Sequence, residues 1–422
     1  MERDRLGNPL APGFPYARGP IIRNTEDDVR KLRQAWRLIE ARVRKDGAEA
    51  VFNFTGLERG LHVDPSEFPF LDDELAPALY AERITALALE HLGGEPGRHD
   101  IMLFNRLTAA TLATHLALVK PGDTVIGVSA SYSHPTVVRA AAHVGARFVD
   151  TVGADAFAAA LERAERPALV VLTRLAVTYE ALPIGDLRRV VALAHERGAP
   201  VYVDDAGGAR VGPAVLDQPR MLELGVDVGA TGLDKYGTSG PRLGLLAGET
   251  ARVAVIRARA FEFGLEARPM LYPAVLRSLE QYSPERVRRL VECTKGVAAA
   301  LRSLLGRRLR ETPVTAQLHG EDILELALER AGLRTSPLVP IEATAALAML
   351  LLRDYGVLTV HFAGMPPGIS AILFKFVPPD ILARFGGATA LAAAVDASLG
   401  RLADLVGSPE AIRALLFGDP AP

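Results

Sequence analysis

The stretch "VYVDDAGGAR" at residues 201–210, followed by "TGLDKYGTSGPRLGLLAG" at residues 231–248, decides the fold of this chain of 422 residues. The first stretch is an apolar run that ends in two neighbouring carboxylates, Asp204 and Asp205. In the second, one lysine, Lys235, stands in a glycine-rich turn before another apolar run. Continuous apolar runs are typical of strands in a parallel sheet, which bind ligands at their carboxyl ends. We therefore expect a carboxylate and an amine at that edge of a sheet.

This pair of groups matches the needs of a pyridoxal 5'-phosphate (PLP) enzyme. A lysine amine supplies an imine to the cofactor aldehyde, and a carboxylate keeps the pyridine nitrogen protonated, so that the ring accepts electrons. Lys235 is the lysine that stands just after a strand and downstream of an acidic strand end. Because side chains alternate along "VYVDD", Asp204 and Asp205 point to opposite sides and only one can face the cofactor.

Composition narrows the classes of protein. Lys plus Arg (48) nearly balances Asp plus Glu (50), and no basic run indicates a nucleic-acid surface. The single cysteine, Cys293, excludes a disulfide within one chain and fits a reducing compartment. We find neither a signal peptide nor an apolar stretch of the roughly 20 residues that a membrane span needs, nor the spacing of a metal site. We therefore expect a cytoplasmic protein without a metal.

The chain alternates helical stretches with short apolar runs from about residue 75 to 250. This pattern predicts an α/β fold whose mostly parallel sheet is covered on both faces. The expected strands are residues 124–129, 147–151, 168–173, 201–205, 226–230 and 243–248.

The ends of the chain have a different texture. A helix is expected over residues 25–46, and a smaller C-terminal α/β domain follows the sheet. The domain's expected helices lie at 284–305, 342–355 and 388–406, and its strands at "VTAQLH" (314–319), "VLTVHF" (357–362) and "ISAILFKF" (369–376). We therefore divide the chain into an N-terminal arm and helix (1–74), a large PLP-binding domain (75–280) and a small C-terminal domain (281–422).

Two segments suit further parts of a PLP site. The segment "FNRLTAATLATHLALVKPGD" at 104–123 leads into a helix, and Arg106, Leu107 and Thr108 would form a phosphate cradle there, although an ordinary helix start has the same letters. His134, in "SYSHPTV", stands between a strand and a helix, where an imidazole can lie over the pyridine ring. A solvated loop histidine or a helix cap would look the same.

The motifs resemble the fold-type-I PLP enzymes, and among them the group of selenocysteine synthase (the bacterial seryl-tRNA selenium transferase) and the D-glucosaminate-6-phosphate ammonia-lyase-like proteins. The resemblance covers residues 75–285 and rests on "FNRLTAA", "VDDAGGA", "LDKYGTSGPRLGLLAG" and "ARPMLYPAVLRSLEQY" (267–282). It implies that Lys235 is the Schiff-base lysine, Asp204 the partner of the pyridine nitrogen and His134 the stacking ring. Arg268 would bind a substrate or cofactor anion. It also implies a homodimer or a multiple of dimers.

Cys293, the segment before the aspartate strand and four arginines bear on the class of reaction. Cys293 lies in a helical context, which does not favour a cysteine desulfurase, and an Asn-Pro segment typical of aminotransferases is missing before the aspartate strand. We favour a lyase that acts on a small amino acid or amino-sugar acid by β-elimination, β-replacement or retro-aldol cleavage. Arg106, Arg174, Arg210 and Arg268 are the candidates for binding the substrate. An aminotransferase and a non-catalytic protein of the same fold are the alternatives.

Overall fold

The structure is a computed structural model that describes residues 2–164 and 166–418. The chain forms two compact units. The large unit is Glu58–Arg288, and the discontinuous unit combines Met1–Leu57 with Arg289–Pro422. The expected large domain, residues 75–280, thus lies inside the large unit, and the two ends of the chain share the other unit.

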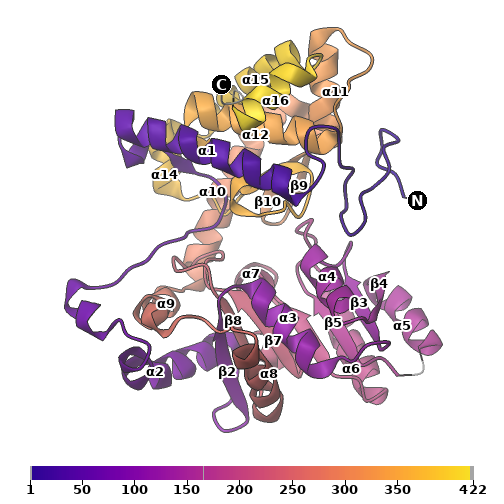
Figure 1. Ribbon diagram of the computed structural model, residues 1–422, viewed down its shortest axis with the longest axis vertical. Helices are drawn as coiled ribbons and strands as arrows, with labels where there is room; N and C mark the ends of the chain where they lie inside the picture. Colours follow the sequence, from indigo (N-terminus) through magenta and orange to yellow (C-terminus); the bar gives the residue numbers. More distant parts are fainter. Residues whose placement is uncertain (1, 165, 419–422) are drawn as a thin grey trace. The chain divides into compact units, whose positions relative to one another are not determined.

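A seven-stranded sheet forms the centre of the large unit, with the strand order β2-β8-β7-β6-β5-β3-β4 (Figure 1). The pairs from β7 to β4 are parallel, whereas β8 runs antiparallel to both of its neighbours. The expectation of a mostly parallel sheet is therefore confirmed. The strands are β2 (His99–Phe104), β3 (Thr124–Ser129), β4 (Arg147–Val152), β5 (Leu169–Thr173), β6 (Val201–Asp204), β7 (Val228–Gly232) and β8 (Gly244–Glu249).

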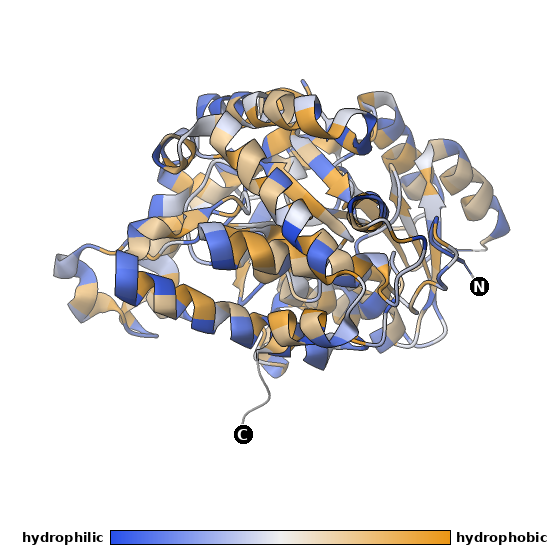
Figure 2. Ribbon diagram, turned by 90° about the horizontal axis from the view of Figure 1, so that it is seen from above, coloured by the Kyte–Doolittle hydropathy of each residue, from blue (hydrophilic) through white to orange (hydrophobic). Residues whose placement is uncertain are grey.

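Helices cover both faces of this sheet, and the side chains of β6 show the division. Tyr202 packs in a buried cluster with α3 and α8, whereas Val203 packs in a second cluster with α2, α6 and α9. Figure 2 shows hydrophobic and hydrophilic residues alternating along the helices, as expected of elements with one buried side. The helices are α2 (Leu75–Leu92), α3 (Leu107–Leu118), α4 (Pro135–His143), α5 (Gly153–Arg163), α6 (Ile184–Glu196), α7 (Gly208–Val215), α8 (Thr250–Glu262) and α9 (Tyr272–Glu280).

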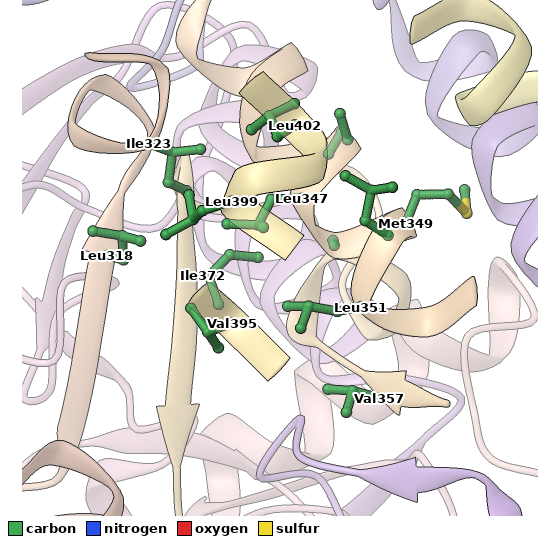
Figure 3. Close-up of a cluster of buried hydrophobic side chains, with 14 of the residues drawn as sticks. Leu318, Ile323, Leu347, Met349, Leu351, Val357, Ile372, Val395, Leu399 and Leu402 are labelled. Atoms are coloured by element: carbon green, nitrogen blue, oxygen red, sulfur yellow. The ribbon is translucent and has the colours of Figure 1, made fainter. Parts of the chain in front are cut away.

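The discontinuous unit is built around α12 (Pro340–Tyr355), which is apolar on nearly every side and correspondingly buried (Figure 3). A small antiparallel sheet of order β12-β10-β9 and a parallel pair of β1 with β11 accompany it. The helices are α1 (Thr25–Asp46), α10 (Pro284–Leu305), α11 (Gly320–Ala331), α13 (Val360–Ala363), α14 (Pro379–Phe385), α15 (Gly387–Leu405) and α16 (Pro409–Phe417). The strands are β1 (Phe52–Asn53), β9 (Leu309–Thr312), β10 (Thr315–His319), β11 (Val357–Leu358) and β12 (Ala371–Lys375).

One expected strand of this unit is wrong. "VLTVHF" forms only the two residues of β11 before the chain turns into the short helix α13. Thr359 adopts an extended conformation at the start of that helix, and it separates the two elements. The apolar residues of this stretch are therefore buried in two short elements, β11 and α13, and not along one strand.

A buried carboxylate ties the beginning of the chain to α12. Glu342, in the first turn of that helix, accepts hydrogen bonds from the backbone N–H groups of Ile21 (2.6 Å) and Ile22 (2.9 Å). Its other oxygen accepts one from the N–H of Val339 at 3.2 Å. Burial raises the pKa of Glu342, and these three donors oppose the rise. The segment before α1 is thus an integral part of the discontinuous unit.

None of the helices in residues 2–164 and 166–418 combines the length and the apolar character that a membrane crossing requires.

Candidate active site

Three of the predicted site residues follow the carboxyl ends of parallel strands in the large unit. His134 follows β3, Asp204 is the last residue of β6, and Lys235 follows β7. Because β6 pairs in parallel with both β5 and β7, and β5 with β3, these ends lie at one edge of the sheet. Electrostatic interactions connect the three groups, since the charge of Lys235 lowers the pKa of both His134 and Asp204.

Asp204 is a buried carboxylate that receives no hydrogen bond from the described residues. Burial, and then the charge of neighbouring Asp205, raise its pKa to about 7, and Lys235 opposes this rise. The backbone alternation places Asp204 on the same side of β6 as Tyr202, towards α3. An acceptor of this kind fits a protonated pyridine nitrogen, which would supply both the missing donor and the missing positive charge.

Asp205 points to the other face and has a different partner. Its Oδ2 accepts a hydrogen bond of 2.7 Å from Nη2 of Arg174, and both side chains are fully buried. Arg174 also donates from Nη1 to the carbonyl oxygen of Pro219 at 2.7 Å. This ion pair makes Arg174 part of the packing beneath the sheet.

Lys235 sits in a tightly held loop after β7. Its side chain folds back along Gly232, where an added Cβ would lie 3.0 Å from the Lys235 Cγ and Cε atoms. The hydroxyl of Thr238 donates to the carbonyl oxygens of Leu233 (2.9 Å) and Lys235 (2.7 Å) and so closes the turn. Burial lowers the pKa of the Lys235 amine, although the carboxylate of Asp234 opposes it. A lowered pKa favours the neutral, nucleophilic amine.

His134 is the N-cap of α4. Its Nδ1 accepts a hydrogen bond of 3.1 Å from the backbone N–H of Thr136, which leaves the proton on Nε2. Burial, followed by the charge of Lys235, lowers its pKa to about 4, so the imidazole is neutral at physiological pH. His134 therefore caps α4 and, at the same time, lies near enough to Lys235 for the two groups to interact electrostatically.

The predicted phosphate cradle is the start of α3. Arg106 is its N-cap residue, and no side chain caps the N–H groups that follow at Leu107 and Thr108. An uncapped helix start with its positive dipole end is suited to an anion. The cradle packs against Gly244 of β8, where a Cβ would lie 2.9 Å from backbone atoms of Arg106 and Leu107. Glycine therefore allows the two backbones to approach.

Sequence reasoning missed two arginines beside this cradle. Arg59 donates from Nε to Asp234 Oδ2 at 2.8 Å, next to Lys235. Arg242 has no hydrogen bond or ion pair with any residue in the described ranges, and burial with the charges of Arg59 and Arg106 lowers its pKa to about 10. The carboxylate of Asp234 carries one negative charge beside these arginines, and a phosphate dianion would fit the positive charge of Arg242 and Arg106. The position of Arg242 in the same glycine-rich turn as Lys235 could have identified it from the sequence. Nothing in the sequence pointed to Arg59.

A pair of tyrosines completes the edge of the sheet. The hydroxyl groups of Tyr179 and Tyr236 are 2.7 Å apart, and Tyr236 directly follows Lys235. A Cβ at Gly207 would lie 2.0 Å from the Tyr236 ring, so that ring packs flat on the backbone after β6. Tyr179 has a φ of 66°, a left-handed conformation that is uncommon for a bulky residue. The hairpin turn that carries Tyr179 thus delivers its hydroxyl to the neighbour of Lys235.

The arginines expected to bind substrate lie in different environments. Arg174 and Arg210 are fully buried, and Arg210 donates from Nη1 to the carbonyl oxygen of Gly232 at 2.7 Å. Neither guanidinium is exposed, because Arg174 pairs with Asp205 and Arg210 packs against the end of β7. Arg268 is exposed and forms an ion pair with Asp73.

Comparison with known proteins identifies relatives over nearly the whole chain. No family model matches. A UPF0425 pyridoxal phosphate-dependent protein of Methanosphaera stadtmanae is 31% identical over 84% of this chain and 90% of its own length. One of Methanothermobacter thermautotrophicus is 30% identical over 94% of this chain and 100% of its own length.

Solved structures share the fold at low sequence identity. Alanine–glyoxylate aminotransferase from Nostoc sp. matches with a TM-score of 0.54 and 17% identity over 83% of this chain and 95% of its own. Serine palmitoyltransferase from S. paucimobilis matches with a TM-score of 0.55 and 19% identity over 86% of this chain and 84% of its own. The fold and its relatives define a fold-type-I, PLP-dependent enzyme. The chain belongs to the UPF0425 family of pyridoxal phosphate-dependent proteins.

We expect Arg242→Gln to weaken PLP binding at least about tenfold, because a charge-assisted contact to a phosphate contributes roughly 1.5–3 kcal/mol. Titration of the apoprotein with PLP, followed by the quenching of protein fluorescence, measures this affinity. Arg259→Gln is the matched control, since this exposed arginine pairs with Glu262 on α8. Equal PLP affinities for the two variants would exclude Arg242 from the phosphate site.

Proposed function

We propose that this enzyme is a lyase that acts on a small amino acid or amino-sugar acid by β-elimination, β-replacement or retro-aldol cleavage, as in the selenocysteine synthase-like group. The catalytic residues of the proposal are Lys235, Asp204 and His134. The observation that carries it is the electrostatic coupling of these three groups at one edge of the sheet. Neither the fold nor the family name specifies the reaction.

The residues divide the work according to their environments. Bound PLP supplies a ring that accepts the electrons of a bond broken at the substrate Cα. Lys235 would hold the cofactor and, with its lowered pKa, would accept a substrate proton: from Cα in elimination or replacement, and from the β-hydroxyl in retro-aldol cleavage. Asp204 would hold the proton at the pyridine nitrogen, and the neutral imidazole of His134 would be the ring that lies against the cofactor. The phosphate is assigned to the cradle and its neighbours, namely Arg106, Leu107, Thr108, Arg59 and Arg242.

Two observations favour β-elimination or β-replacement over other PLP reactions. The hydroxyls of Tyr179 and of Tyr236, the residue after Lys235, lie 2.7 Å apart and remain protonated, because burial raises the pKa of each. Protonated hydroxyls suit a step in which an oxygen leaves the β-carbon with developing negative charge. Cys293 lies in α10 and packs against the core of the discontinuous unit, where burial raises its pKa. It is a packing residue and no sulfur carrier.

Arg268 is the proposed contact for a substrate anion. Of Arg174, Arg210 and Arg268, the last is the exposed one. Its partner Asp73 is also exposed. A surface ion pair of this kind contributes little stability, so a carboxylate or phosphate can replace Asp73 at small cost.

A screen of amino acids tests the reaction. The PLP-loaded enzyme is mixed with serine, threonine, cysteine and phosphorylated or sugar-derived amino acids, and the visible absorbance and the products are followed. We expect ammonia with an oxo acid, or an aldehyde, and no turnover by Lys235→Ala. The fold neighbours named as aminotransferases make transamination the second candidate. Accumulation of pyridoxamine phosphate with a new amino acid as the product would replace the lyase by that reaction.

The same enzyme is proposed to form a homodimer, or a multiple of dimers, in the cytoplasm. Exposed apolar side chains gather along one segment of the large unit, which favours burial against a second copy. They are Leu61, Phe68, Phe70, Leu75 and Leu79. A fully active monomer in light scattering at assay concentration would contradict the dimer, and fractionation of the native cell tests the location.

A further inference from the structure

Arg210 is a fully buried cation without a counter-ion. Its Nη1 donates to the carbonyl oxygen of Gly232 at 2.7 Å, but Nε and Nη2 have no hydrogen-bond partner. Two other fully buried cations have a carboxylate within reach: Arg174 pairs with Asp205 at 2.7 Å, and Lys31 pairs with Asp28 at 3.4 Å. Within the described ranges, Arg210 has no carboxylate oxygen within 4.0 Å. An isolated buried charge is costly unless something compensates it.

The carboxylates that act on Arg210 already form ion pairs with other arginines. The charges of Asp234 and Asp205 both act on Arg210, but Asp234 pairs with Arg59 and Asp205 with Arg174. Asp205 cannot neutralise two guanidinium groups, so one positive charge remains. A water molecule could satisfy the N–H groups, but it would leave that charge in place.

Two further groups that can donate hydrogen bonds lie near Arg210, namely the side chains of His91 and Tyr282. His91, at the end of α2, is nine-tenths buried, and neither of its ring nitrogens has a partner. Its ring lies edge-on to that of Tyr282, with the centroids 4.3 Å apart, just after α9. The charge of Arg210 acts on both rings, and α2 and α9 lie side by side in Figure 1. Since burial keeps His91 neutral and Tyr282 protonated, each offers a donor without adding charge.

We propose that Arg210, His91 and Tyr282 form a buried binding site for a small monovalent anion. The anion supplies the compensating charge and accepts hydrogen bonds from Nε and Nη2 of the guanidinium, and the imidazole N–H and the phenol O–H complete the coordination. Asp204 lies on the α3 side of β6, whereas His91 belongs to α2, which covers the opposite face. The anion would stabilise the large unit, because it would compensate the buried charge of Arg210.

The test measures the thermal midpoint of the PLP-saturated protein in sodium chloride, sodium acetate and sodium gluconate at equal ionic strength. We expect chloride, acetate or both to raise the midpoint saturably by about 2 °C or more above gluconate, which is too large for the site. Arg210→Met and His91→Phe are expected to lose this rise. Arg220→Gln is the matched control, because this half-exposed arginine also acts on His91 but pairs with Glu223.

Crystals soaked in bromide give a second readout that does not depend on the stability of a variant. An anomalous peak between Arg210 and His91 supports the site. A rise with chloride assigns it to a halide, and a rise with acetate alone to a carboxylate. Equal midpoints in the three salts, an anion effect that persists in both variants, or a rise with chloride but no bromide peak at this position would overturn the proposal.

Discussion

Lys235→Ala is expected to abolish covalent retention of PLP and to lower turnover by at least about 10³-fold, because the same amine holds the cofactor and carries the proton. Reduction of the wild-type holoenzyme with borohydride, followed by peptide mapping, should place the cofactor label on the peptide that contains Lys235. The variant should remain folded, since the substitution removes an amine whose charged form is disfavoured by burial.

Lys120→Ala provides the control for this experiment, because Lys120 is an exposed lysine in the same unit. It should keep the visible absorbance band of the bound cofactor and normal turnover. A label on any other lysine, or an unchanged band in Lys235→Ala, would contradict the assignment.

Asp204→Asn is expected to lower turnover by about 10²-fold or more and, at the same time, to stabilise the apoprotein at pH 8. The first effect follows because the amide cannot hold a proton at the pyridine nitrogen. The second follows from the pKa of Asp204, which burial raises to about 7 in the folded protein from 3.8. The folded apoprotein then binds more protons than the unfolded chain between these pH values. Ionisation of Asp204 therefore costs stability as the pH rises through this window.

Urea unfolding of the two apoproteins at pH 4 and pH 8 measures this difference. The advantage of Asp204→Asn should be small at pH 4 and grow to about 2–4 kcal/mol at pH 8, since one pKa unit corresponds to about 1.4 kcal/mol. Asp205→Asn should behave in the opposite way, because it leaves the buried Arg174 without its counter-ion. If both variants destabilised the apoprotein equally at pH 8, the two aspartates would not differ as the structure indicates.

The sequence allowed the sheet and its ligand edge to be predicted because both follow from local patterns. Apolar runs that end in Asp204 or lead to Lys235 report burial on both faces and the point where each strand stops. β2 escaped this reasoning because its place depends on pairing with β8, more than a hundred residues away in the chain. Arg59 escaped for the same reason, since only the folded chain brings it to Asp234.

The arginines show a different limit of prediction from sequence. Arg174 and Arg210 stand at strand ends or just beyond them, where a ligand contact is the natural expectation. The side of the sheet to which each guanidinium turns depends on alternation and on partners, and Asp205 draws Arg174 away from the cofactor face. A position along the chain could thus be predicted, but the direction of the side chain could not.

The division of the chain has a consequence for its synthesis. The large unit is contiguous, so it can fold on the ribosome once Arg288 has left the exit tunnel. The first 57 residues, by contrast, have their partners in the segment that starts at Arg289. Ile21 and Ile22 emerge early, but Glu342, which accepts their N–H groups, is translated some three hundred residues later. The apolar side chains of the N-terminal segment therefore stay uncovered until the segment that starts at Arg289 has been translated. We expect nascent chains to be most vulnerable to proteases, and most dependent on chaperones, during that interval.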